Sequence, residues 1–197
     1  MFDYKPTLLV VGDSFAGGTG DPTFRTYPYL LGDRLGWSLT VDAQGGTGFI
    51  NVAGGPETHR VPFIDRLARD EQEYNADYVL IDGGRNDLGL QPADVVVAAD
   101  EYIKKVRATW PNAKIIVVLP SYVSAQEASN FPAVSSGMRR SAEEVGAYVI
   151  DPVAEGWYRG KDLAPFLWKD GVHLNGEGNA YYADRIIGSL RAMGLAK

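Results

Sequence analysis

The stretch LLVVGDSFAGGTGD (residues 8–21) runs from a short apolar segment into Gly12, Asp13 and Ser14, and then into a glycine-rich turn. An apolar run without alternation that ends at a glycine is typical of a strand buried on both faces of a parallel sheet. Three interpretations of the turn are open. Asp13 and Ser14 are turn formers, or Ser14 is a nucleophile at the end of a strand, or the glycines cradle a phosphate. The rest of the chain has to decide between them.

Similar apolar segments recur along the chain and alternate with segments of helical periodicity. The expected strands are Thr7–Val11, Leu39–Val41, Tyr78–Ile81, Lys114–Leu119 and Tyr148–Ile150. The expected helices are Tyr27–Leu35, Val61–Glu73, Ala93–Trp110, Pro132–Gly146 and Gly176–Met193. This alternation indicates β-α-β units, and it predicts an α/β fold with three layers, α/β/α, around a five-stranded parallel sheet.

The pattern also predicts where side chains lie. In the longest helical segment we expect a buried stripe of Val96, Val97, Tyr102, Ile103 and Val106. Glycine clusters directly follow three of the expected strands, at residues 17–20, 45–48 and 83–84. Because the carboxyl ends of parallel strands meet at one edge of the sheet, where ligands bind in open α/β folds, we expect the functional site there.

Length and composition exclude several classes of protein. A chain of 197 residues is most simply one domain, residues 1–197. The net charge of −6 argues against binding of nucleic acid or of an anionic membrane surface. The lack of cysteine excludes thiol catalysis, disulfides and thiolate metal sites. Without a visible signal peptide or a long apolar run, we expect a soluble protein with no membrane span, in a compartment that the sequence leaves open.

The phosphate interpretation of the first turn fails on spacing. A P-loop needs a lysine after its second glycine, but Gly18 follows Gly17. The dinucleotide fingerprint needs a glycine where this chain has Ser14.

A serine nucleophile needs a base, and the chain has only two histidines. His59 lies in a polar loop without an evident partner, which is typical of a solvated side chain. His173 lies three residues after Asp170, close enough in a turn for the carboxylate to orient the imidazole. The alternative is that Asp170 shapes the turn and Asn175 caps the following helix.

Two further turns carry groups suited to an oxyanion. Asn86 follows the third expected strand in Asp82-Gly83-Gly84-Arg85-Asn86-Asp87, and its amide can donate to an oxyanion or simply form an Asn-Asp turn. The glycines at 45, 46 and 48 follow the second strand and allow a backbone N–H to approach a substrate oxygen.

The order of these motifs resembles the SGNH, or GDSL-type, hydrolase family. Gly12-Asp13-Ser14 matches its first block, Gly46 its second, Gly84-Arg85-Asn86-Asp87 its third and Asp170-Gly171-Val172-His173 its last. The resemblance covers nearly the whole chain and implies a flavodoxin-like sheet. It separates the chain from α/β-hydrolases, whose nucleophile lies in G-x-S-x-G, because Ala16 stands at the final glycine's place.

The resemblance implies a role for each residue. Ser14 is the expected nucleophile, His173 the base and Asp170 its partner, with oxyanion donors from Ser14, Gly46 (or Gly48) and Asn86. Substrate contacts are expected at the residues Asp13, Gly48, Arg85 and Trp168. No metal and no organic cofactor is expected.

The predicted function is that of a serine esterase that forms an acyl-enzyme on a short acyl ester, including O-acetyl groups on a carbohydrate. Trp157, Tyr158 and Trp168 either contact the sugar or acyl group or simply pack. The alternatives are hydrolysis of longer acyl chains by a lipase or thioesterase, a glycan-binding module without turnover, and a catalytic component of a larger surface or phage assembly.

Overall fold

The computed structural model describes residues 4–18, 23–54, 59–121 and 130–197. Its sheet contains β1 (Thr7–Gly12), β2 (Ser38–Ala43), β3 (Tyr78–Asp82), β4 (Lys114–Val118) and β5 (Tyr148–Ile150). All neighbours pair in parallel, in the order β2-β1-β3-β4-β5. The predicted α/β fold with a five-stranded parallel sheet is confirmed, and each expected strand lies within two residues of the observed one.

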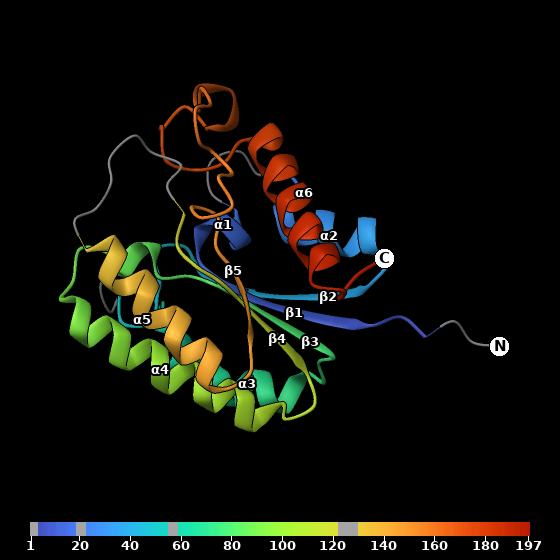
Figure 1. Ribbon diagram of the computed structural model, residues 1–197, viewed down its shortest axis with the longest axis vertical. Coiled ribbons are helices and arrows are strands. Elements are labelled where there is room, and N and C mark those ends of the chain that lie inside the picture. Colours follow the sequence, from blue (N-terminus) through green and yellow to red (C-terminus); the bar gives the residue numbers. More distant parts are fainter. Residues whose placement is uncertain (1–3, 19–22, 55–58, 122–129) are drawn as a thin grey trace.

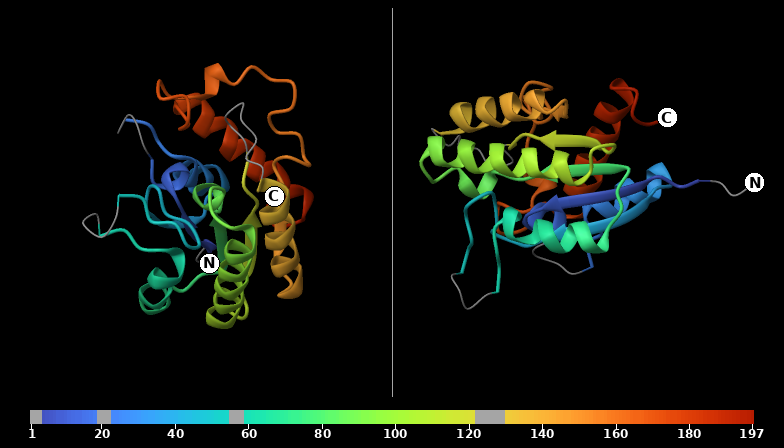
Figure 2. Two further views of the ribbon diagram at one scale, coloured as in Figure 1. Left: turned by 90° about the vertical axis from the view of Figure 1, so that its left-hand side faces the viewer. Right: turned by 90° about the horizontal axis from the view of Figure 1, so that it is seen from below.

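Helices cover both faces of the sheet (Figure 1). The helices α2 (Tyr27–Leu35) and α6 (Gly176–Ala192) pack together on one face, while α3 (Phe63–Glu73), α4 (Pro92–Thr109) and α5 (Phe131–Glu144) cover the other, as the two views in Figure 2 also show. The expected helices match these five to within two residues. Short helical turns follow β1 at α1 (Ser14–Gly17), β3 at η2 (Arg85–Asp87) and β5 at η3 (Ala164–Phe166).

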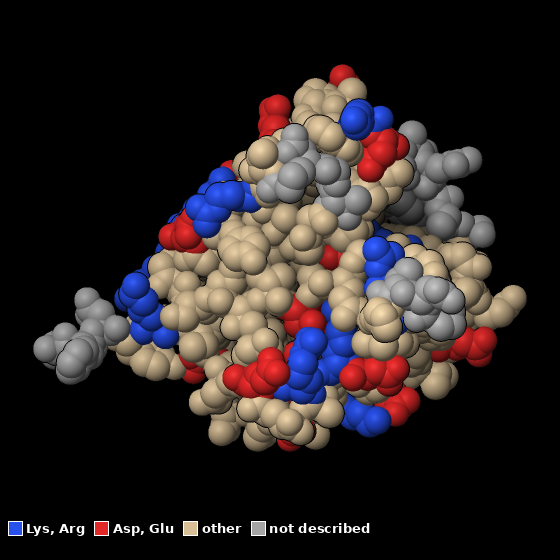
Figure 3. Space-filling view, turned by 180° about the vertical axis from the view of Figure 1, so that it is seen from behind, with Lys and Arg blue, Asp and Glu red and all other residues tan. Residues whose placement is uncertain are grey.

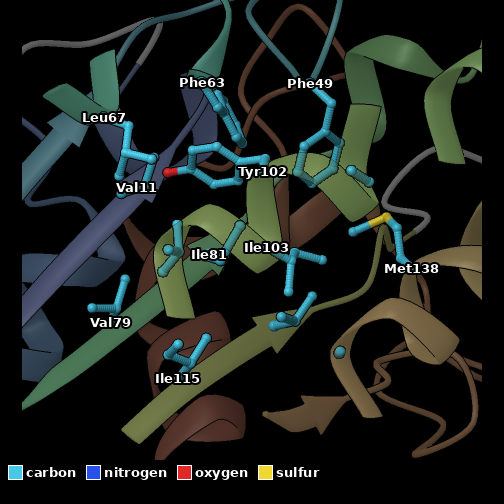
Figure 4. Close-up of a cluster of buried hydrophobic side chains, with 14 of the residues drawn as sticks. Val11, Phe49, Phe63, Leu67, Val79, Ile81, Tyr102, Ile103, Ile115 and Met138 are labelled. Carbon is cyan, nitrogen blue, oxygen red and sulfur yellow. The ribbon is translucent and has the colours of Figure 1, made fainter. Parts of the chain in front are cut away.

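The apolar strands have no alternation because both of their faces are buried. Leu9, Val11 and Ile81 point toward α3, α4 and α5 and belong to the cluster drawn in Figure 4. Leu8 and Val10 point to the opposite face, where they join the cluster beneath α2 and α6. The sheet is therefore the middle layer of three, and its carboxyl edge is free to carry the turns.

One detail of the predicted core is wrong. Val97 is 67% exposed, and the buried stripe of α4 instead runs through Val95, Ala99, Tyr102, Ile103 and Val106. With 3.6 residues per turn, Val97 lies about 200° around the helix from Val95 and faces solvent. The sequence does not show which of these positions faces the core, because residues 95, 96 and 97 are all valine and equally apolar.

Charged side chains of both signs lie close to one another on the face seen in Figure 3. Among the described residues, none of the helices combines the length and the apolar character needed to cross a membrane.

Candidate active site

Ser14 is the first residue of α1, and Asp13 alone separates it from the end of β1. Asp13 caps this short helix, since its Oδ1 accepts a hydrogen bond from the N–H of Phe15 at 2.9 Å. The turn is tight: a Cβ on Gly12 would lie 2.6 Å from that of Ala16. The glycine-rich turn that the sequence indicates after Ser14 is thus helical as far as Gly17, and residues 19–22 lie outside the described part.

His173 reaches Ser14 from the other end of the sequence. Its Nε2 lies 3.0 Å from Oγ of Ser14, and its Nδ1 lies 2.7 Å from Oδ2 of Asp170. The other oxygen of Asp170 accepts hydrogen bonds from the backbone N–H groups of Val172 at 2.9 Å and His173 at 3.0 Å. Asp170 therefore shapes the turn and faces the imidazole at once, so the two interpretations of this residue are compatible.

These contacts keep Asp170 ionised. Partial burial acts to raise its pKa, but the backbone and ring N–H groups of His173 and the N–H of Val172 outweigh it and hold the pKa of Asp170 at about 2. A carboxylate rather than a carboxylic acid thus faces Nδ1 at any ordinary pH.

The beginning of α6 holds this turn in place. Asn175 caps the helix, as its Oδ1 accepts from the N–H of Gly178 at 2.9 Å. Its Nδ2 donates to the carbonyls of Pro165 at 2.8 Å and Leu167 at 3.0 Å. One side chain thereby joins the segment before His173 to the helix after it.

The turn after β3 sends successive side chains in different directions. Gly84 adopts a left-handed φ of 93°, which glycine tolerates, and η2 follows it. Nδ2 of Asn86 donates to the carbonyl of Thr47 at 2.9 Å and lies 3.4 Å from Oδ2 of Asp13. Asn86 is therefore placed between the turns after β1 and β2.

The two candidate glycines in the turn after β2 differ in the hydrogen bonding of their backbone N–H groups. Gly46 has a φ of 75°, and the described part of the chain provides no acceptor for its N–H. The N–H of Gly48, in contrast, donates to the carbonyl of Asn51 at 3.0 Å. A Cβ on Gly48 would also lie 2.0 Å from Asp87, which accounts for glycine at this position without any substrate contact.

Asp13 and Arg85, two of the residues expected to contact substrate, lie beneath the site. Asp13 is 1% exposed, and its Oδ1 lies 3.2 Å from Nη2 of Arg85. The same Nη2 lies 2.8 Å from Oδ1 of Asp82. Asp82 was not singled out from the sequence; the signal for it was an acidic residue that ends an otherwise apolar strand.

The aromatic candidates separate into two groups. Trp157 is fully buried and packs edge-on against Tyr182, with ring centroids 5.2 Å apart, so packing is the correct interpretation. Trp168 is half-buried, lies edge-on to Phe24 at 5.1 Å, and donates its backbone N–H to the carbonyl of His173 at 2.7 Å. His59 is exposed, as expected of a solvated loop residue.

Two cavities lie at the carboxyl edge of the sheet. A space of about 10 Å³ is lined by Ser14, His173 and their neighbours, including Phe24 and Thr26. A larger, mainly apolar hollow of about 280 Å³ lies beyond β4 and β5, lined by the residues Ser121, Pro152, Val153, Gly156, Tyr158, Arg159 and Leu163. From the sequence, the long segments 48–63 and 121–131 are also expected to shape the pocket, but residues 55–58 and 122–129 lie outside the described part.

The fold recurs among solved structures. The psychrotrophic esterase EstA from Pseudoalteromonas sp. superimposes with a TM-score of 0.76 at 18% identity, over 96% of this chain and 98% of that one. Est24, a carbohydrate acetylesterase from Sinorhizobium meliloti, superimposes with a TM-score of 0.72 at 17% identity, over 96% of this chain and 100% of that one. Because the sequence identities are only 18% and 17%, these similarities show that the fold is shared and nothing beyond the fold.

Sequence similarity goes further. A GDSL lipase of Mycobacterium tuberculosis is 31% identical over an alignment 199 residues long, which covers 93% of this chain and 81% of that protein. Residues 10–181, from the strand before Ser14 to the helix after His173, match the GDSL-like lipase/acylhydrolase family. A match of this extent shows that the chain belongs to this family of carboxylic ester hydrolases.

Proposed function

We propose that Ser14, His173 and Asp170 hydrolyse an ester through an acyl-enzyme. The Ser14 hydroxyl attacks the ester carbonyl and Nε2 of His173 takes its proton, while Asp170 stabilises the imidazolium through Nδ1–H. His173 then returns the proton to the leaving alcohol. Water, activated by the same imidazole, releases the acid and frees Ser14. The observation that carries this proposal is the continuous hydrogen-bonded line from Asp170 through His173 to Ser14, with distances of 2.7 and 3.0 Å.

The negative charge that develops on the carbonyl oxygen needs donors. We assign this role to the backbone N–H groups of Ser14 and Gly46 and to the side-chain amide of Asn86. Gly46 is preferred to Gly48 because the N–H of Gly48 already donates to Asn51. The glycine at 46 also leaves room for Ala53, whose Cβ would lie 2.4 Å from a Cβ at that position.

The proposed substrate is a short acyl ester, including O-acetyl groups on a carbohydrate. The space that Ser14 and His173 line in common, about 10 Å³, is enough for roughly one water molecule and supports a small acyl group over a long chain. Solved structures of the same fold include the acetylesterase Est24 and a family two carbohydrate esterase from Clostridium thermocellum. Trp168 and Gly48 stay predicted substrate contacts. We also propose that residues 1–197 form a single domain.

A panel of substrates tests both parts of the proposal. Acetyl, butyryl, octanoyl and palmitoyl esters of p-nitrophenol and an acetylated xylan are given to the wild type and to Ser14→Ala. We expect rates that fall with acyl length, acetate release from the xylan, and no hydrolysis by Ser14→Ala. Ser136→Ala, which removes a hydroxyl on the exposed face of α5, is the matched control and should keep full activity.

The outcomes separate the alternatives. Full activity of Ser14→Ala would overturn the nucleophile, and faster hydrolysis of palmitoyl than acetyl esters would overturn the short acyl group. A protein that binds the glycan but is not labelled at Ser14 by a fluorophosphonate would be a binding module without turnover.

A further inference from the structure

Two buried carboxylates lie behind the proposed nucleophile, with one guanidinium between them. Asp13 and Asp82 are 1% and 0% exposed, and Nη2 of Arg85 lies 3.2 Å from the first and 2.8 Å from the second. The Arg85 side chain itself is only 10% exposed. Charges buried in this way are tolerated only when they are paired, so the three residues form one electrostatic unit.

Asp82 has further partners, but Asp13 depends more on Arg85. The hydroxyl of Tyr27 donates to Oδ2 of Asp82 at 2.7 Å, and the hydroxyl of Tyr182 lies 3.2 Å from its Oδ1. Asp13 accepts from the N–H of Phe15 and lies at a longer distance from Asn86, and neither of these groups carries a charge. Arg85 is thus the cation that balances Asp13.

The position of Asp13 makes this balance important for the reaction. The residue directly precedes Ser14, and its Oδ2 lies 3.4 Å from Nδ2 of Asn86, the proposed oxyanion donor. An uncompensated carboxylate beside this amide would repel the negative charge of the transition state. The guanidinium also lies over the ring of Phe15, 4.2 Å from its centroid, and so packs against the helix that carries Ser14.

The pKa shifts of Asp82 and Arg85 have the directions expected of charged groups that act on one another. Burial raises the pKa of Asp82, Arg85 lowers it, and Asp13 raises it further. Burial opposes the charge on Arg85, but Asp13 and Asp82 outweigh it, so the pKa of the guanidinium lies above its ordinary value. Arg85 therefore stays charged between the two acids.

We propose that Arg85 is a positioning residue that neutralises Asp13, and that it thereby keeps a negative charge from opposing the oxyanion next to Asn86. The proposal rests on the function proposed above. It gives Arg85 of the Gly84-Arg85-Asn86-Asp87 motif a task in catalysis without substrate contact.

The experiment compares Arg85→Gln with variants that remove the carboxylates as well. Arg85→Gln alone leaves two buried carboxyl groups without their cation and can fail to fold, so the decisive variant is Asp82→Asn with Arg85→Gln, which leaves Asp13 as the one carboxyl group of the unit. With p-nitrophenyl acetate we expect its kcat to fall about 10–100-fold with little change in KM. Adding Asp13→Asn, which keeps an acceptor for the N–H of Phe15, should restore much of the lost kcat.

The controls separate this effect from a general loss of stability. Arg107→Gln removes an arginine in the last turn of α4 that donates to the carbonyls of Ala113 and Val145. It should lower the urea midpoint and leave kcat unchanged. Wild-type kcat in the double variant, or a loss that persists in the triple variant, would overturn the proposal.

The same assay shows whether the proposed function, ester hydrolysis by Ser14, is itself wrong. Activity of Ser14→Ala would overturn the nucleophile and the role of Arg85 together. An inactive Ser14→Ala beside a fully active double variant would overturn the role of Arg85 alone.

Discussion

The carboxylate of Asp87 occupies the space that a side chain on Gly48 would need: a Cβ there would lie 2.0 Å from Oδ2. Asp87 is fully buried and accepts from the N–H groups of Phe49 at 2.8 Å, Ile50 at 3.1 Å and Asn51 at 2.8 Å. Asn51 in turn donates to the carbonyl of Gly46 at 2.9 Å. The last residue of the turn after β3 therefore holds the turn after β2, which carries a proposed oxyanion donor.

Gly48→Ala should break this link. Because the methyl group and the Asp87 carboxylate cannot share the space, we expect a loss of about 1–3 kcal/mol in the free energy of unfolding. We also expect a lower kcat, since the turn at Gly46 loses its support. Urea unfolding and p-nitrophenyl acetate hydrolysis measure the two effects. Gly89→Ala is the control, because a Cβ on Gly89 would have no neighbour within 4 Å and the methyl group should be tolerated there.

Asp170→Asn should remove the partner of His173 while keeping the size of the side chain. The amide cannot stabilise the imidazolium as the carboxylate does, so kcat should fall by about 10³-fold or more. Asp162→Asn is the matched control, because Asp162 also accepts from a backbone N–H two residues on, that of Ala164, but faces no imidazole. A change of less than tenfold in Asp170→Asn would contradict the assigned role.

Asn86→Ala should remove one of the three proposed oxyanion donors. A donor aimed at the developing charge contributes to kcat rather than to substrate binding, so we expect kcat to fall about 10²–10³-fold with a KM near that of the wild type. Asn130→Ala, which removes an amide that bonds the carbonyls of Leu88 and Leu90, serves as the control for lost backbone contacts. A rise in KM with kcat unchanged would instead place Asn86 in ground-state binding.

The sequence was sufficient to predict the strands, the helices and the proximity of Ser14 to His173. Strands buried on both faces are apolar at every position, and their carboxyl ends meet at one edge, so residues 159 positions apart were expected together. Asp13 and Arg85 were expected at the same edge, but the direction of their side chains was not predicted. That direction depends on the tertiary pairing with Asp82, which no local pattern encodes.

The helical phase of α4 and the short helix α1 were missed for local reasons. Consecutive valines at 95, 96 and 97 fit more than one helical stripe, and only packing against the sheet chooses between them. Glycines after Ser14 argue for a loop, since glycine disfavours helices, but the Asp13 cap supports one turn there.

A second buried charge cluster lies on the other face of the sheet. Nε of Arg66 lies 3.2 Å from Oδ2 of Asp42, and Nη2 of Arg69 lies 3.1 Å from Oδ1 of Asp70. Burial and then the charge of Asp42 raise the pKa of Asp70 to about 6, although Arg69 acts in the opposite direction. The ordinary value for this acid is 3.8, so the native state binds its proton more tightly than the unfolded chain does.

Asp70 should therefore make the protein less stable as the pH rises. A raised carboxyl pKa means that the native state holds more protons between about pH 4 and 6, so the free energy of unfolding falls through this window and levels off above it. In Asp70→Asn this dependence is absent, and the stability of the variant relative to the wild type should rise from pH 4 to pH 7 by on the order of 2 kcal/mol. Urea midpoints at both pH values measure the difference, and Asp65→Asn, at an exposed position of the same helix, gives the control. A relative stability that is constant or falls with pH would show that Asp70 is ionised in the native state throughout this range.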